Sequence, residues 1–160
     1  MADDDEARGL ELMREAEAQI LSGVDRLAAQ WVQAAVEHRI RDADQTVREE
    51  ARVAGIAARE RVTKELRELF AVDPAQQRAT PLEIVRTLRY EVTAVLAARD
   101  VPTVVRDPFE VRSFADDVYG VVPRSLSDLG DEDLGPLLLA WGLGKSKVLR
   151  ARATRGTSSE

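Results

Sequence analysis

Apolar residues recur at helical spacing through the first 72 residues of the chain, and no proline interrupts them. A first set steps mostly by three or four positions, so its members share one face of a helix. A second set keeps the same period but begins six residues after the first set ends, which puts the two out of phase. The first set is Met13, Ile20, Val24, Leu27, Trp31 and Ala34, and the second is Ile40, Ala43, Val47, Ala51, Ala54, Ala58, Val62, Leu66 and Leu69. The pattern predicts two amphipathic helical stretches.

The break between the two sets falls in a polar run over residues 37–45. One structure that fits is a helical hairpin, in which Thr46 caps the second helix and Glu49 completes a capping box. The other is one continuous helix of ~90 Å over residues 9–72, which buries its apolar sets against a partner chain as a coiled coil. The lack of glycine in residues 37–45 favours the continuous helix, and compactness favours the hairpin, so both structures stay open.

A further helix is predicted over residues 81–99, where the start signal is the clearest in the chain. Thr80 stands at the N-cap position, Pro81 at the first helical position and Glu83 at the capping-box position. The short connection before it would let this helix fold back on the preceding one.

The remainder of the chain divides by composition. Proline and glycine are too frequent over residues 100–135 for long elements, so we expect an irregular segment of short helices there, followed by a helix over residues 136–150. An acidic lead-in, residues 1–8, and a basic tail, residues 151–160, are expected to be disordered. The predicted organisation is therefore a single helical domain over residues 9–150.

Composition supports an all-α fold of long amphipathic helices. Of the 160 residues 44% are hydrophobic but only 4% aromatic, which suits closely packed helices better than a sheet sandwich. There is no cysteine, so neither a disulfide nor a thiolate metal site contributes. The first residues lack the features of a signal peptide, and the longest apolar run is about half of what a membrane span needs. We therefore expect a cytoplasmic protein that does not bind membranes.

Three sequence features suggest chemistry but lack the residues to perform it. Gly144, Lys145 and Ser146 resemble the end of a phosphate-binding loop, but Leu139 stands where that loop needs a glycine. The acids from Asp131 to Asp133 would need a glutamate twelve positions into a calcium loop, where Gly142 stands. His38 is the only histidine, and neither a zinc site nor a general-base system can be assembled around it. We therefore expect no catalytic, cofactor-binding or metal-binding residues and a protein that is not an enzyme.

Charge is unevenly distributed along the chain, whose net formal charge is −6. The first 20 residues are acidic, and the last 19 carry five bases against one acid. Such a basic end can contact phosphates, although it equally complements the dipole of a helix C-terminus. The candidate nucleic-acid-binding residues, for a nucleic acid or ribosome contact, are Lys145, Lys147, Arg150, Arg152 and Arg155.

Short motifs in the second half of the chain suggest a relationship. They are Phe70, Pro81-Leu82, Val104-Val105-Arg106-Asp107-Pro108-Phe109, Asp116-Asp117-Val118-Tyr119-Gly120 and Trp141-Gly142. Together they resemble a family of small cytoplasmic proteins in high-GC Gram-positive bacteria, and the excess of arginine over lysine fits a GC-rich genome. The resemblance implies a bacterial cytoplasmic protein and brings no activity or functional residue with it.

The first functional hypothesis is a non-catalytic interaction or scaffold protein that self-associates or binds a partner helix. The candidate partner-binding residues are Ile20, Val24, Leu27, Trp31 and Ala34, because this face has no intrachain cover if the long helix is continuous. If the chain folds back on itself, the same residues instead form its own core. The alternative function is nucleic-acid or ribosome association through the basic tail.

Overall fold

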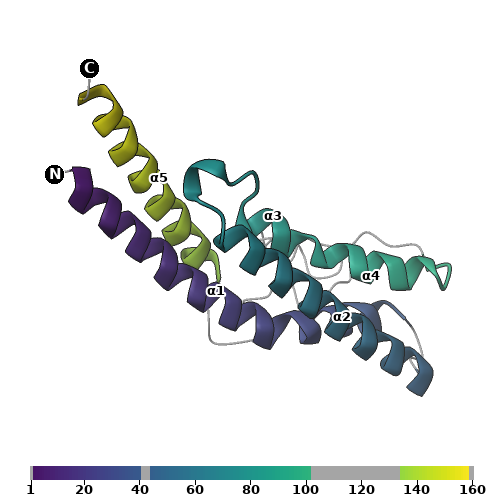
Figure 1. Cartoon of the computed structure of the whole chain (residues 1–160). Coiled ribbons are helices and arrows are strands. Elements are labelled where there is room, and N and C mark those ends of the chain that lie inside the picture. The colour runs from purple at the N-terminus through teal and green to yellow at the C-terminus, as the bar shows by residue number, and fades with distance from the viewer. Residues whose placement is uncertain (1, 41–43, 102–133, 159–160) are drawn as a thin grey trace, which may run out of the picture.

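The computed structural model describes residues 2–40, 44–101 and 134–158, and helices account for nearly all of them (Figure 1). No strand occurs within these ranges, which confirms the prediction of an all-α fold. In chain order the elements are α1 (Ala2–Arg39), α2 (Gln45–Phe70), the 3-10 turn η1 (Pro74–Gln76), α3 (Pro81–Arg86), α4 (Leu88–Ala97) and α5 (Leu134–Ser158).

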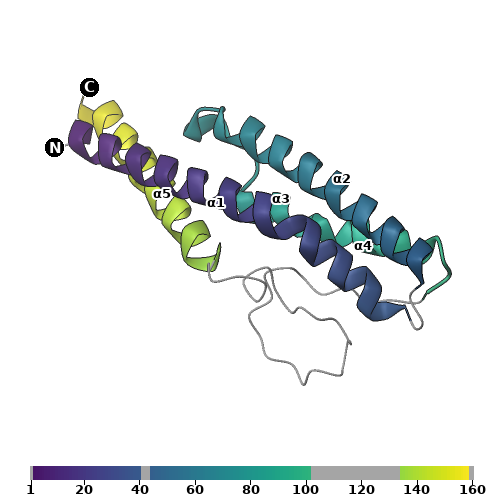
Figure 2. The same ribbon diagram turned by 90° about the horizontal axis from the view of Figure 1, so that it is seen from below.

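Helix α1 is the element on which the others are assembled. Its 38 residues span about 57 Å at 1.5 Å per residue. Helices α2 and α4 pack against its C-terminal half, and α5 runs antiparallel to its N-terminal half, which brings the two ends of the chain side by side (Figures 1 and 2). We call the pairing of α5 with the N-terminal half of α1 the arm, and the packing of α2 and α4 on the C-terminal half the bundle.

Helices α1 and α2 form a hairpin, so the alternative of one continuous helix is wrong. The predicted cap is also displaced by two residues. Asp44 is the N-cap of α2, and its Oδ1 accepts a hydrogen bond from the backbone N–H of Val47 at 2.9 Å. A carboxylate at this position satisfies a free N–H group and interacts favourably with the helix dipole, so Thr46 lies inside the first turn instead of capping it.

The predicted helix over residues 81–99 begins as expected but is interrupted. Thr80 caps α3 by accepting from the N–H of Glu83 at 3.3 Å. At Thr87 the side-chain hydroxyl donates to the carbonyl of Ile84, and Arg61 of α2 donates to the Thr87 hydroxyl at 3.0 Å. These side-chain bonds compete with the helical backbone pattern. The stretch is therefore two helices, α3 and α4.

Both ends of the chain are more ordered than the sequence suggested. Helix α1 begins at Ala2 and α5 extends to Ser158, whereas residues 1–8 and 151–160 were expected to be disordered and the last helix to end near residue 150. The two ends order each other, because the acidic start of α1 and the basic end of α5 form ion pairs in the arm. The predicted irregular segment lies outside the described residues over 102–133.

Candidate functional site

The predicted partner-binding face of α1 lies inside the protein. The exposed fractions of Ile20, Val24, Leu27 and Trp31 are 1%, 0%, 2% and 0%, and Ala34 is partly buried. The first four belong to one apolar core with residues of α2, α4 and α5, among them Val62, Leu66, Leu88, Leu96 and Val148. Because the chain folds back at the break in the pattern, it covers this face itself. Ile20, Val24, Leu27 and Trp31 are therefore core residues and not an exposed contact surface.

In the arm, two glycines allow α5 to approach α1 with backbone against backbone. A Cβ atom on Gly9 would lie 2.7 Å from the carbonyl oxygen of Gly144, and one on Gly144 would lie 2.8 Å from that of Gly9. Neither position has room for a larger side chain without movement of a backbone. At Gly142, by contrast, such a Cβ would have no neighbouring atom within 4 Å, and this glycine faces outward.

The predicted nucleic-acid-binding residues are divided between the arm interface and the surface. Arg152 binds Glu6 at 3.0 Å and Asp73 at 2.7 Å, and Arg155 binds Asp3 at 3.1 Å and also Glu6. Lys145 lies 5.3 Å from the centre of the Trp141 ring. Only Lys147 and Arg150 are exposed without a carboxylate partner in the described ranges. The basic end thus serves first as an internal counterpart to the acidic start of α1.

Ionisation of two carboxyl groups is altered where the arm meets the end of α2. The hydrogen bond from Arg152 holds the pKa of Asp73 below its usual 3.8. Burial raises the pKa of Glu17 above its usual 4.5, although Trp141 Nε1 donates to its Oε1 at 3.3 Å. Phe70 lies beside Trp141, with ring centres 6.4 Å apart.

These groups border a cavity of about 380 Å³, and the sequence analysis did not anticipate it. Its polar lining includes Arg14, Glu17, Asp73, Gln77 and Arg152, which come from α1, the end of α2, the loop after η1 and α5. Within the described ranges no three or more His, Cys, Asp or Glu side chains are placed to hold a metal ion. Chemically, the cavity offers one carboxylate of raised pKa among salt-bridged neighbours.

Two apolar surfaces remain exposed in the described part of the chain. On α5, Leu139 and Leu143 are 66% and 60% exposed, and at i,i+4 spacing they share the face opposite the buried Val148. The second is an open groove of about 520 Å³ between α2 and α4. Its apolar residues are Val53, Ala54, Ala94, Val95 and Ala98, and Glu49 and Glu50 stand at its edge.

The sequence carried a signal for the first surface. Leu139 and Leu143 fall within an apolar run, but neither was among the predicted partner-binding residues. None of the helices in the described ranges combines the length and apolar character needed to cross a membrane.

His38 lies in the last turn of α1, and its side chain lies outside the described part of the structure.

Comparisons with known proteins identify no relative. No protein-family model, curated protein or solved structure matches this chain. The resemblance to a family of high-GC Gram-positive bacteria therefore stays a prediction, and function has to be argued from the surfaces described above.

Proposed function

We propose that this chain is a non-catalytic interaction protein that self-associates through the outward face of α5. The observation that carries the proposal is the exposure of Leu139 and Leu143 on a helix whose opposite face is fully packed. Large apolar side chains that adjoin one another on a surface favour a binding site. The proposal keeps the function expected from the sequence but moves its surface from α1 to α5.

A second copy of the chain suits this face because the arm is only two helices thick. Helix α5 buries one face on α1, while Leu139, Gly142 and Leu143 on its other side stay open. Two arms packed through these faces give a four-helix arrangement that covers all four leucines. The small neighbours Gly142 and Gly135, both exposed, let two backbones come close. A twofold contact needs only one patch per copy, and this patch has no charged centre that would repel itself.

Charge selects the relative direction of the two α5 helices. Lys147 and Arg150 are exposed in the C-terminal half, beyond Leu143. A parallel contact would place these cations beside their copies, whereas an antiparallel contact centred between Leu139 and Leu143 separates them. We therefore propose an antiparallel, isologous contact in which Leu139 of one copy packs against Leu143 of the other.

The test is absolute mass by light scattering after gel filtration, over a range of protein concentrations. We expect the wild-type chain to have twice its monomer mass, and Leu139→Asp with Leu143→Asp to be a folded monomer, because each aspartate would have to be desolvated in the contact. The control is Val53→Asp, which adds one of these two charges at a position that is 54% exposed in the groove between α2 and α4. It should leave the dimer intact.

Other outcomes contradict the proposal. A wild-type monomer at high concentration rules out self-association. If the two aspartates on α5 instead unfold a monomeric chain, the leucines are covered within that chain. A dimer split only by Val53→Asp would place the contact in the groove.

Nucleic-acid association through the basic end has weaker support. Arg152 and Arg155 already bind carboxylates of α1 and Asp73. A phosphate would have to displace these partners, so only Lys147 and Arg150 are open to it. Two contacts of this kind predict weak binding that salt readily abolishes.

A further inference from the structure

A second cavity, of about 480 Å³, opens between α1 and α2 on the bundle side of the hairpin. It begins beyond the closest approach of the two helices, where a Cβ on Gly55 would lie 2.5 Å from the carbonyl oxygen of Ala29. Past that point α2 separates from α1 (Figure 1). The lining residues are Asp25 of α1 and, from α2 and its end, Arg59, Glu60, Thr63, Lys64, Arg67, Glu68 and Ala71.

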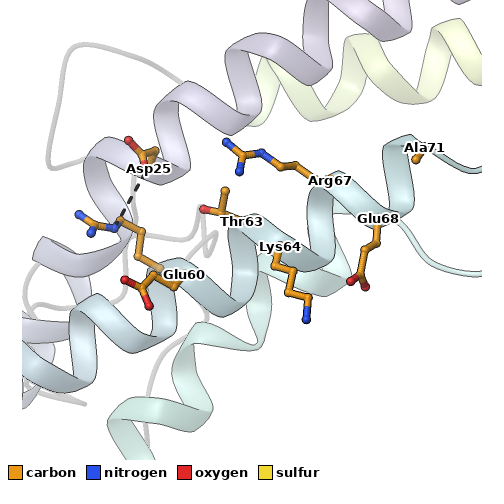
Figure 3. A pocket seen from close by; sticks show the side chains of 8 residues that line it. Asp25, Glu60, Thr63, Lys64, Arg67, Glu68 and Ala71 are labelled. Atoms are coloured by element: carbon orange, nitrogen blue, oxygen red, sulfur yellow. Dashed lines mark ion pairs between the residues drawn. The ribbon is translucent and has the colours of Figure 1, made fainter.

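The wall that faces α1 consists of hydrogen-bond donors. Arg59, Thr63 and Arg67 follow one another at i,i+4 spacing and so share one face of α2. Figure 3 shows Thr63 and Arg67 reaching toward α1, while Lys64 and Glu68 point to the other side of the helix. Lys64 and Glu68 also belong to the lining, but their charged groups point away from α1 (Figure 3).

Two of these donors lack acceptors in the described part of the chain, and the third has only a long ion pair. Arg67 has no carboxylate partner there, and Nε of Arg59 is 4.0 Å from Oδ1 of Asp25, which is the limit of an ion pair. Thr63 is only 8% exposed, and its hydroxyl has no hydrogen-bond partner among the described residues. A buried hydroxyl without a partner is unfavourable, and helical threonines ordinarily bond to a carbonyl one turn back.

We propose that this cavity binds a small oxyanion of phosphate size. Arg67 supplies charge and two parallel N–H donors, the geometry that guanidinium groups offer to phosphate. Thr63 supplies a hydroxyl one turn away. Its oxygen is covered in the present side-chain conformation, and rotation about Cα–Cβ exchanges it with the methyl group and turns it into the cavity. Arg59 completes the set once it leaves Asp25.

Asp25 has a defined role in this site. Its carboxylate repels an incoming anion and competes with it for Arg59. Binding in the wild-type chain is therefore weak, and removal of the Asp25 charge should strengthen it. The carboxylates of Glu60 and Glu68 also make the electrostatic potential of the cavity less favourable for an anion. Lys64, another lining residue, offsets part of their charge.

The experiment is calorimetric titration of the full chain with inorganic phosphate, with sodium chloride at the same ionic strength as the reference. We expect Arg67→Gln to weaken binding about tenfold or more, since a charge-assisted bond is lost. The control is Arg48→Gln, an equal change of charge at an exposed position near the start of α2, which should leave binding within about twofold. Asp25→Asn should strengthen binding.

Thr63→Val separates a binding role from a structural one. Without phosphate it should raise the melting temperature, because an unpaired buried hydroxyl becomes a methyl group. With phosphate it should show a smaller increase in melting temperature than the wild-type chain. The proposal fails if phosphate gives no more heat or thermal protection than chloride, or if Arg67→Gln and Arg48→Gln change binding equally.

Discussion

The two halves of α1 share apolar packing, but the ion pairs are concentrated at the start of its N-terminal half. In the bundle, Val24, Leu27 and Trp31 are enclosed by apolar side chains of α2 and α4. In the arm, α1 meets α5 through the buried residues Met13, Trp141 and Val148, a glycine contact and a series of ion pairs at its end. Apolar burial is nearly insensitive to salt, whereas partly exposed ion pairs are screened by it. Helix α1 therefore joins a region held by apolar packing to a region whose outer end is also held by salt-sensitive ion pairs.

The comparison also explains the uneven charge of the chain. The acidic residues at the start of α1 and the basic residues at the end of α5 meet because the two helices run antiparallel (Figure 2). Each end also carries the charge that suits its own helix terminus, with acids in the first turn of α1 and Arg155 near the end of α5. The same residues thus stabilise both helix ends and the contact between them.

The largest effect is expected from Trp31→Ala in the bundle. Removal of a fully buried indole leaves a cavity among close-packed neighbours and should cost about 3–5 kcal/mol of unfolding free energy. Urea unfolding followed by circular dichroism gives the value. A loss below about 1 kcal/mol would mean that the first set of apolar residues, on α1, does not form the core.

Alanine substitutions at two glycines of α5 should have opposite effects on stability. At Gly144 an added methyl group meets the backbone of α1, so Gly144→Ala should destabilise the chain by about 1–3 kcal/mol. At Gly142 the space is open, so Gly142→Ala should stabilise it by about 0.5–1 kcal/mol through better helix propensity. Thermal unfolding of both variants checks the signs. Equal effects would contradict the close approach of α5 to α1.

An intermediate loss is expected from Arg152→Gln, which removes the ion pairs with Glu6 and Asp73 at once. Because these groups are partly exposed, the cost should be only about 1 kcal/mol at low salt and less at high salt. Arg150→Gln is the control, since Arg150 is exposed on the same helix and pairs with no carboxylate within the described ranges. Unfolding of both variants at two salt concentrations separates specific pairing from net charge.

The smallest effect is expected from Glu17→Gln. Burial raises the pKa of Glu17, so the folded state holds its proton to higher pH than the unfolded state. Wild-type stability therefore falls as pH rises from the usual 4.5 through the raised pKa. Glutamine keeps the acceptor for Trp141 without the charge, so the variant should be more stable than wild type at neutral pH and equal to it below pH 4.5. Denaturation at both pH values tests the sign.

Asp73 should have the opposite effect on the pH dependence of stability, so that stability falls as pH is lowered. Its pKa is lowered by Arg152, so the stability that this pair contributes is present above the usual 3.8 and lost as pH falls through the lower folded value. Asp73→Asn should therefore flatten the pH dependence in that range. A curve that matches the wild-type curve would show that Asp73 and Arg152 do not couple in solution.

The sequence predicted the helices far better than the contacts between them. The periodic stripe on α1 and the Thr80 cap follow from local rules that operate within a few residues. The choice between hairpin and continuous helix depended on a long-range contact, and the cap at Asp44 was missed because Thr46 and Glu49 offered a competing local pattern. The pairing of Arg152 with Glu6 spans nearly the whole chain, and no spacing rule reaches that far.

The candidate sites were harder to predict for the same reason. The apolar face of α1 that includes Trp31 was predicted to be an interface only if no other part of the chain packed on it. Whether another helix packs on that face depends on the tertiary fold. Leu139 and Leu143 lie in an apolar run with Gly142 and Gly144, and only Gly144 contacts α1. Apolar character and spacing do not reveal which face of a helix its own chain will bury.

The most direct test is amide hydrogen exchange along α1 at about 0.05 M and 1 M sodium chloride. We predict that amides of residues 6–17 lose about two- to tenfold of their protection at high salt, as the ion pairs of the arm are screened, while those of residues 24–36 stay unchanged. If both halves of α1 respond equally, or if the first half is insensitive to salt, the two regions do not differ in what stabilises them.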